Sequence, residues 1–256
     1  MLLLDVDGPI ATVTLNRPEA RNALSVELTD AVQGAIAELD GRDDVSVIIL
    51  TGADPAFCAG VDLKQLASQE QPERVVRLAG APAFFGPLPP HDTPVIGAIN
   101  GPAVTGGLEL VLACDFLIAS DRATFADTHA RVGVMPGWGL TVRLPAVIGI
   151  NRARQMSFTG DYVDARLAHE WGLVNEVVPH ADLLARAREV AAHVASIPPD
   201  HVREIRSMYD DVGALAGEAA WGRESERSRA WMATRFDQGR LAREREAIVE
   251  RGRSQQ

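Results

Sequence analysis

Two kinds of hydrophobic pattern alternate along the first two thirds of the chain. Short apolar runs bounded by Gly, Pro or Asp are typical of strands, and segments with apolar residues every three or four positions are typical of helices. Asp7-Gly8 readily supplies the positive φ of a hairpin turn, and Ser25 suits the N-cap of the first helix. The predicted strands span residues 2–6, 10–15, 45–50, 94–100 and 116–119, and the predicted helices 25–39, 106–113 and 153–158. A mixed α/β architecture follows.

Two segments depart from this alternation. Residues 69–93 are rich in proline and contain the pair Phe84-Phe85, so regular structure is disfavoured there. Both a plain surface loop and a mobile segment over a pocket fit that composition. From residue 199 onward the chain is helical in composition and rich in Arg and Glu. We therefore predict a core over residues 1–198 and a C-terminal helical region over 199–256 that packs on the core or on a neighbouring subunit.

Composition narrows the class of protein. The 256 residues include 46% apolar side chains, enough for a large core, and carry a net charge of −10. An acidic chain does not offer the broad positive surface that nucleic acid or an anionic membrane needs. Cys58 and Cys114 form neither a disulfide framework nor a zinc cluster, and the start of the chain has no basic segment followed by a long apolar run. We expect a cytoplasmic protein with reduced thiols.

Several common catalytic motifs are absent from the sequence. Residues 101–107 have the glycine spacing of a phosphate-binding loop but lack the Lys and Ser/Thr that bind phosphate and magnesium. Residues 133–139 lack the spacing of a dinucleotide-binding turn, and His169-Glu170 has no second histidine at zinc-protease spacing. No serine lies in a Gly-x-Ser-x-Gly elbow. No metal or nucleotide redox cofactor is implied.

Two glycine-containing turns carry the strongest chemical signal. Residues 57–64, FCAGVDLK, and 98–110, AINGPAVTGGLEL, each run from a strand end through small residues to a helix start. Glycine lets the backbone approach a ligand closely, and unpaired N–H groups stabilise negative charge, so two such turns face to face can form an oxyanion hole. Small residues are also common in ordinary turns, so this pattern alone leaves both interpretations open.

With three further motifs, these turns make the chain resemble the crotonase, or enoyl-CoA hydratase/isomerase, superfamily. The further motifs are LNRPEARNAL at residues 15–24, PGWG at 136–139 and TG at 159–160 followed by 168–174. The resemblance is strong over residues 1–195 and weak beyond. It implies a ClpP/crotonase-like spiral of ββα repeats, a C-terminal helical region that forms trimers or hexamers, and an acyl-CoA thioester as substrate, so that CoA enters with the substrate and no separate cofactor is needed.

The resemblance also assigns catalytic positions. Val61 and Gly106 fall where backbone N–H groups polarise the thioester carbonyl, and Glu109 aligns with the first catalytic glutamate of the hydratases. Glutamate is also common in a first helical turn simply because of its charge. At the position of the second catalytic glutamate this chain has His129, with Asp127 on the same face if the segment is extended. An imidazole can transfer protons near neutral pH, but His129 can equally line the pocket or bond the backbone.

The CoA and acyl sites are implied in the same way. Lys64 is the only lysine in the chain and matches a position near the CoA phosphates, although an exposed helix position also suits a lysine. Trp138 stands where the family often has a small residue, which suggests a short acyl pocket or a flat acyl group. Met135, Phe84 and Phe85 are further candidates for the pocket wall. The implied substrate-binding residues are Arg21, Ala23, Ala59, Asp62, Leu63, Lys64 and Trp138.

The sequence therefore predicts an enoyl-CoA hydratase that adds water across the C2=C3 bond of an enoyl thioester. The missing second glutamate argues against an enoyl-CoA isomerase more than against a hydratase in which Glu109 both activates water and returns the proton. Two alternatives stay open: another reaction of the same fold, such as isomerisation, decarboxylation or carbon–carbon cleavage, and a catalytically silent acyl-CoA-binding homologue.

Overall fold

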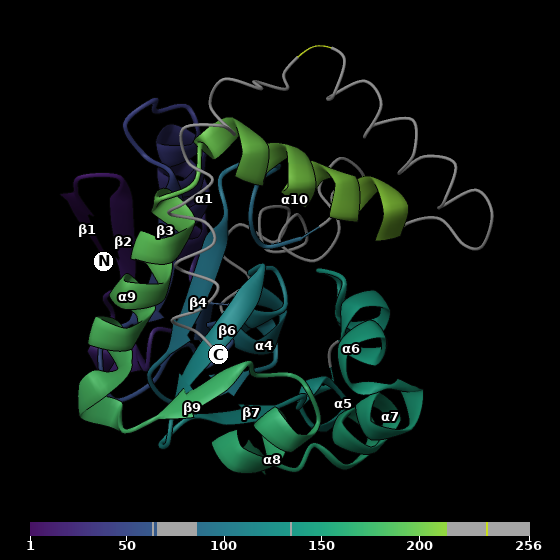
Figure 1. Ribbon diagram of the computed structural model, residues 1–256. Coiled ribbons are helices and arrows are strands. Elements are labelled where there is room, and N and C mark those ends of the chain that lie inside the picture. The colour runs from purple at the N-terminus through teal and green to yellow at the C-terminus, as the bar shows by residue number, and fades with distance from the viewer. Residues whose placement is uncertain (63, 66–85, 134, 214–233, 235–256) are drawn as a thin grey trace. The chain divides into compact units, whose positions relative to one another are not determined.

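The computed structural model describes residues 1–62, 64–65, 86–133, 135–213 and 234 (Figure 1). The chain divides into two compact units, residues 1–203 and 204–256. The strands are β1 (Leu2–Asp7), β2 (Ile10–Leu15), β3 (Val47–Gly52), β4 (Val95–Ile99), β5 (Ala103–Val104), β6 (Phe116–Ser120), β7 (Thr124–Ala126), β8 (Val163–Asp164) and β9 (Glu176–Val178). The helices are α1 (Val26–Asp40), α4 (Gly106–Val111), α5 (His129–Val132), α6 (Leu140–Ile148), α7 (Ile150–Thr159), α8 (Ala165–Glu170), α9 (Leu183–Ala195) and α10 (Pro199–Gly213). Short 3₁₀ turns cover Pro18–Ala20 and His180–Asp182.

A six-stranded sheet in the order β1-β2-β3-β4-β6-β9 forms the frame of the first unit. β1 and β2 are antiparallel and joined at Gly8, whose φ of +57° confirms the predicted hairpin turn. The remaining neighbours are parallel. A second sheet, β5-β7-β8, carries the site described below. The expected mixed α/β architecture is thereby confirmed.

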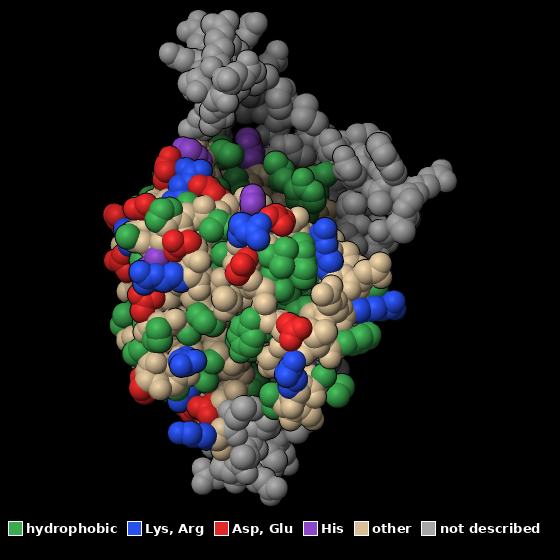
Figure 2. All heavy atoms as spheres, turned by 90° about the horizontal axis from the view of Figure 1, so that it is seen from below, with side chains coloured by type: hydrophobic (Ala, Val, Ile, Leu, Met, Phe, Trp, Pro, Cys, Tyr) green, Lys and Arg blue, Asp and Glu red, His purple; other side chains and the backbone are tan. Residues whose placement is uncertain are grey.

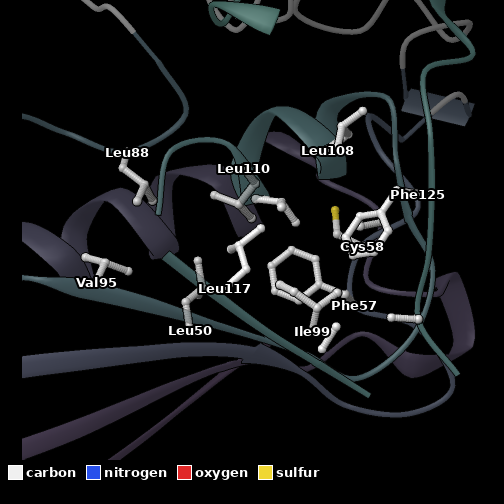
Figure 3. Packing of buried hydrophobic residues seen from close by; sticks show 14 of the residues in the cluster. Leu50, Phe57, Cys58, Leu88, Val95, Ile99, Leu108, Leu110, Leu117 and Phe125 are labelled. Carbon is white, nitrogen blue, oxygen red and sulfur yellow. The ribbon is translucent and has the colours of Figure 1, made fainter. Parts of the chain in front are cut away.

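Both faces of the large sheet are covered by helices. In β3, Ile48 and Leu50 point to one side and Val47 and Ile49 to the other, as the two-residue period of a strand requires. The first side packs against α1 and against the core cluster drawn in Figure 3, which includes Phe57 and residues of α4 and β7. The second side packs against α9 (Figure 1). A strand that is buried on both faces has a continuous run of apolar residues in its sequence. This is why β3 could be predicted from the sequence.

The predicted elements agree with the structure except near their ends. Ser25 caps α1, since its hydroxyl accepts the N–H of Leu28 at 3.2 Å, as predicted. The strand predicted over 45–50 instead begins at Val47 and includes the expected turn residues Thr51 and Gly52, because β2 pairs with it to the end. The helix predicted over 106–113 ends at Val111, and a tighter turn follows it. The helix predicted from 153 begins earlier, at Ile150.

Parts of the predicted loop and C-terminal region lie outside the described residues. Residues 86–93, the described end of the proline-rich segment, form neither helix nor strand.

In the described part of the chain, no helix combines the length and the apolar character needed to cross a membrane. On the face shown in Figure 2, basic and acidic side chains are interspersed, so that face has no broad positive surface.

Candidate active site

Segments far apart in the sequence run side by side at the site. Leu24 forms a parallel bridge with Val61, and Cys58 forms one with Ala103. The latter residue opens β5, which pairs with β7. The end of the N-terminal motif, the two glycine-containing turns and the strand before His129 are therefore neighbours in space. The two turns that the sequence predicted to face one another do lie together.

The backbone nitrogens of the two turns lie close to one another. A Cβ built on Gly60 would lie 3.4 Å from the nitrogen of Gly106, and one built on Gly106 would lie 3.5 Å from the nitrogen of Val61. Among the described residues, no acceptor is bonded to either N–H. Two unpaired donors this close can bind one oxygen that acquires negative charge, which is the arrangement expected of an oxyanion hole.

Thr105 ties the second turn to the neighbouring strand. Its backbone has φ 55° and ψ −112°, a conformation that favours glycine and is unusual for a β-branched residue. Its N–H donates to Ala126 at 2.9 Å, and its hydroxyl lies 2.5 Å from that of Thr128. These bonds hold the turn in its strained form, directly before Gly106.

Glu109 projects from α4 into the buried side of this turn. Its side chain is nearly inaccessible, and one oxygen, Oε1, accepts the backbone N–H of Trp138 at 2.8 Å. Burial raises the pKa of Glu109 above its usual value, because it outweighs the opposing effects of the Trp138 N–H and of His129. The second oxygen, Oε2, lies 3.7 Å from Nε2 of His129. A buried carboxyl with a raised pKa, one oxygen of which lies near an imidazole nitrogen, is suited to exchange a proton.

His129 and Asp127 form a second buried pair. The segment is not extended at this point: β7 ends at Ala126, and α5 begins at His129. The two side chains meet because Asp127 Oδ1 accepts both the backbone N–H of His129 at 3.1 Å, a local Asx turn, and its ring Nδ1 at 2.6 Å. Burial opposes the charge of Asp127, but hydrogen bonds from His129 and Ser157 outweigh it and lower the pKa of the carboxyl.

Trp138 lies beside the oxyanion turn. A Cβ built on Gly106 would be 3.6 Å from Cζ3 of the indole, and the side chain is buried. Met135, another candidate for the acyl pocket, is 76% exposed, so it does not belong to a buried wall in this structure. Phe84, Phe85 and the predicted substrate contact Leu63 lie outside the described residues.

The predicted CoA residues line the outer edge of the first turn. Arg21 and Ala59 are exposed and joined by a backbone hydrogen bond of 3.0 Å, and Ala23 is half-buried. Lys64 is exposed, and its N–H donates to Asp62 at 3.1 Å. The structure thus brings these positions together on an accessible edge.

The role of Arg17 was not predicted from the sequence. Its guanidinium donates to the carbonyl of Ala23 at 2.7 Å and to the carboxylate of Asp62 at 3.1 Å. Asp62 therefore braces the first turn, and the substrate contact implied for it stays a prediction. Asn22 braces the neighbouring loop, since its side-chain amide donates hydrogen bonds to the backbone carbonyls of Ala53 and Ala56. Their place in the motif at residues 15–24 was the available signal.

A sequence model described as enoyl-CoA hydratase/isomerase matches residues 5–242 of the chain. The chain belongs to this family. Family relatives include a probable peroxisomal enoyl-CoA hydratase 1 of Arabidopsis thaliana, 37% identical over 88% of this chain and 83% of the relative. A short-chain-enoyl-CoA hydratase of Clostridium acetobutylicum is 36% identical over 79% of this chain and 78% of the relative.

Solved structures of the family have the same fold. The crystal structure of an enoyl-CoA hydratase from Mycobacterium tuberculosis H37Rv is 48% identical, covers 89% of this chain and 97% of its own, and gives a TM-score of 0.76. One from Geobacillus kaustophilus, at 29% identity, covers 98% of this chain and 95% of its own, with a TM-score of 0.84. The predicted crotonase fold is confirmed by these matches.

Proposed function

We propose that this chain is an enoyl-CoA hydratase that adds water across the C2=C3 bond of a 2-enoyl-CoA thioester. The observation that carries the proposal is the position of Glu109, whose Oε2 lies 3.7 Å from Nε2 of His129, on the helix that begins at the oxyanion residue Gly106. The names of the family relatives, among them several enoyl-CoA hydratases, support the same reaction.

The geometry supports a stepwise account of the hydration. The N–H groups of Val61 and Gly106 bind the thioester oxygen and stabilise the enolate that forms when water adds to C3. Glu109 takes the proton that the water loses, and the neutral acid then returns a proton to C2, which restores both the carboxylate and the thioester carbonyl. His129 contacts the same water. Oε2 of Glu109 and Nε2 of His129 are 3.7 Å apart. One water oxygen can therefore lie within a hydrogen-bond distance of about 2.8 Å from both atoms.

We infer that CoA enters as part of the substrate, with Lys64 and Arg21 near its phosphates, and that no metal or separate cofactor takes part. The chain assembles as a trimer or a hexamer through its C-terminal region, residues 199–256, and acts in the cytoplasm. Sedimentation or light scattering of the full chain tests the assembly.

The reaction is tested by following the loss of the enoyl-thioester absorbance of crotonyl-CoA between pH 5 and 9. We expect wild-type turnover, a loss of about 10²- to 10⁴-fold in kcat for Glu109→Gln, and little change for Glu170→Gln, an exposed control. A loss for His129→Ala shows that the histidine takes part in the reaction as well. Binding of crotonyl-CoA without hydration would overturn the proposal in favour of another reaction of the fold or a silent binder.

A further inference from the structure

The carboxylate of Asp127 is a buried charged group that the reaction above does not use. Only 2% of the residue is accessible. It accepts hydrogen bonds from the ring Nδ1 of His129, from the backbone N–H of the same residue and from the hydroxyl of Ser157 in α7. Burying a carboxylate is costly, so a charge kept here by three hydrogen bonds calls for a reason beyond packing.

The bond to Nδ1 decides which nitrogen of His129 carries the proton. An ionised carboxylate has no hydrogen to donate, so at 2.6 Å the ring nitrogen must be the donor. A neutral His129 then has its proton on Nδ1 and an unshared pair on Nε2. This unprotonated Nε2 lies 3.7 Å from Oε2 of Glu109.

This tautomer suits hydration. The attacking water has two O–H groups and two lone pairs, and both lone pairs stay available to C3 when both hydrogens point to acceptors. Oε2 of Glu109 is one acceptor, and Nε2 of His129 is the other only when it is unprotonated. With the opposite tautomer, the Nε2–H group would compete for the water lone pair or for Glu109.

We propose that Asp127 is a positioning residue that fixes His129 with Nε2 unprotonated, so that Glu109 and His129 hold the attacking water as two acceptors. The proposal rests on the hydratase function above. The water proton passes to Glu109 as oxygen bonds to C3, while His129 accepts the second O–H bond throughout and Asp127 remains ionised. The pair thus replaces the carboxylate that the hydratases have at position 129.

The tautomer is measured directly by magic-angle spinning NMR of the full chain with ¹⁵N-labelled histidine at pH 8, with His129→Gln used to assign the His129 signals. We expect wild-type His129 to be protonated at Nδ1 alone, and Asp127→Ala to shift the proton to Nε2. Wild-type His129 protonated at Nε2, or at both nitrogens, would overturn the proposal, even if Asp127→Ala fails to fold. This measurement needs no turnover, so it separates the proposal from failure of the hydratase function, which shows as no hydration by the wild type.

A double-mutant cycle tests the same link in catalysis. With crotonyl-CoA, we expect Asp127→Ala to lower kcat by about 10²-fold in the wild-type background and by less than about twofold in the His129→Gln background, because the aspartate acts only through the histidine. Equal losses in both backgrounds would show a merely structural role. Asp54→Ala removes the acid of another Asp–His pair, with His180, and serves as the matched control with unchanged kcat.

Discussion

Glu109 and Trp138 are joined by a hydrogen bond from the tryptophan backbone N–H to Oε1, 2.8 Å long, although 29 positions separate the two residues. The bond orients the carboxyl and opposes the rise in its pKa that burial causes. It also ties the acid/base group to the segment that carries the predicted acyl-pocket tryptophan. A substrate that displaces Trp138 would therefore disturb Glu109 as well.

The raised pKa of Glu109 predicts that Glu109→Gln is more stable than wild type at pH 8. A carboxyl whose pKa is higher in the fold contributes stability below its unfolded value, near 4.5, and that contribution is lost as the pH rises through the folded value. Glutamine has no charge to bury and still offers an acceptor to Trp138. Thermal unfolding should show a higher Tm for the variant at pH 8 and a difference that shrinks toward pH 4. A lower Tm at pH 8 would contradict the raised pKa.

Gly106 and Gly107 should respond differently to alanine. A Cβ on Gly106 meets Val61 Cγ2 at 3.4 Å, which is tolerable, but it occupies the space beside the Val61 N–H. We expect Gly106→Ala to fold and to lose about 10²- to 10³-fold in kcat, as for removal of one oxyanion donor. A Cβ on Gly107 would lie 2.2 Å from the carbonyl of Cys58, so Gly107→Ala should lower the Tm instead. Full activity of a folded Gly106→Ala protein would refute the oxyanion assignment.

The backbone of Thr105 predicts an unusual order of stability. Thr105→Ala loses the hydroxyl bond to Thr128 but keeps a side chain at φ 55°, whereas Thr105→Gly loses the bond and relieves the strain. Positions of this kind store about 1–3 kcal/mol, and glycine costs about 0.4–1 kcal/mol through the unfolded chain. Denaturant unfolding should therefore find Thr105→Gly more stable than Thr105→Ala by roughly 1 kcal/mol. The reverse order would show that the turn is unstrained.

Local sequence signals predicted most of the fold. Side-chain contacts between residues far apart in the chain were not predicted. Asp7-Gly8 and Ser25 act on their immediate neighbours, so the hairpin and the start of α1 could be located from the sequence. The position of His129 was found by counting from Glu109, but its bond with Asp127 depends on an Asx turn that was not predicted from the sequence. The contact of Arg17 with Asp62 spans 45 positions, so the motif at residues 15–24 could mark Arg17 but not its partner.

We expect the Arg17–Asp62 ion pair to stabilise the first turn. Arg17→Met removes two bonds from a partly buried carboxylate and carbonyl, for which we expect a loss of about 1–3 kcal/mol in the free energy of unfolding at pH 7. Burial alone would raise the pKa of Asp62, but Arg17 and two backbone N–H groups lower it below 3.8. The contribution is thus present above that value and is lost as the pH falls, so the deficit of the variant should shrink in acid. Arg42→Met, at an exposed pair, is the control, and an equal loss there would argue against a specific role.

Trp138 predicts a preference for short acyl chains. The indole is 6% exposed and packs beside Gly106, so it fills space that the acyl carbons following the thioester would otherwise use. Replacing it with alanine should raise the ratio of kcat/KM for 2-decenoyl-CoA to that for crotonyl-CoA by about tenfold, because pocket contacts of this size discriminate to that extent. Trp171→Ala removes an indole that packs under Arg152 outside the site, and it should leave the ratio unchanged. A wild-type protein with equal activity on both chain lengths, or the same ratio in both variants, would show that Trp138 is a core residue and does not limit the pocket.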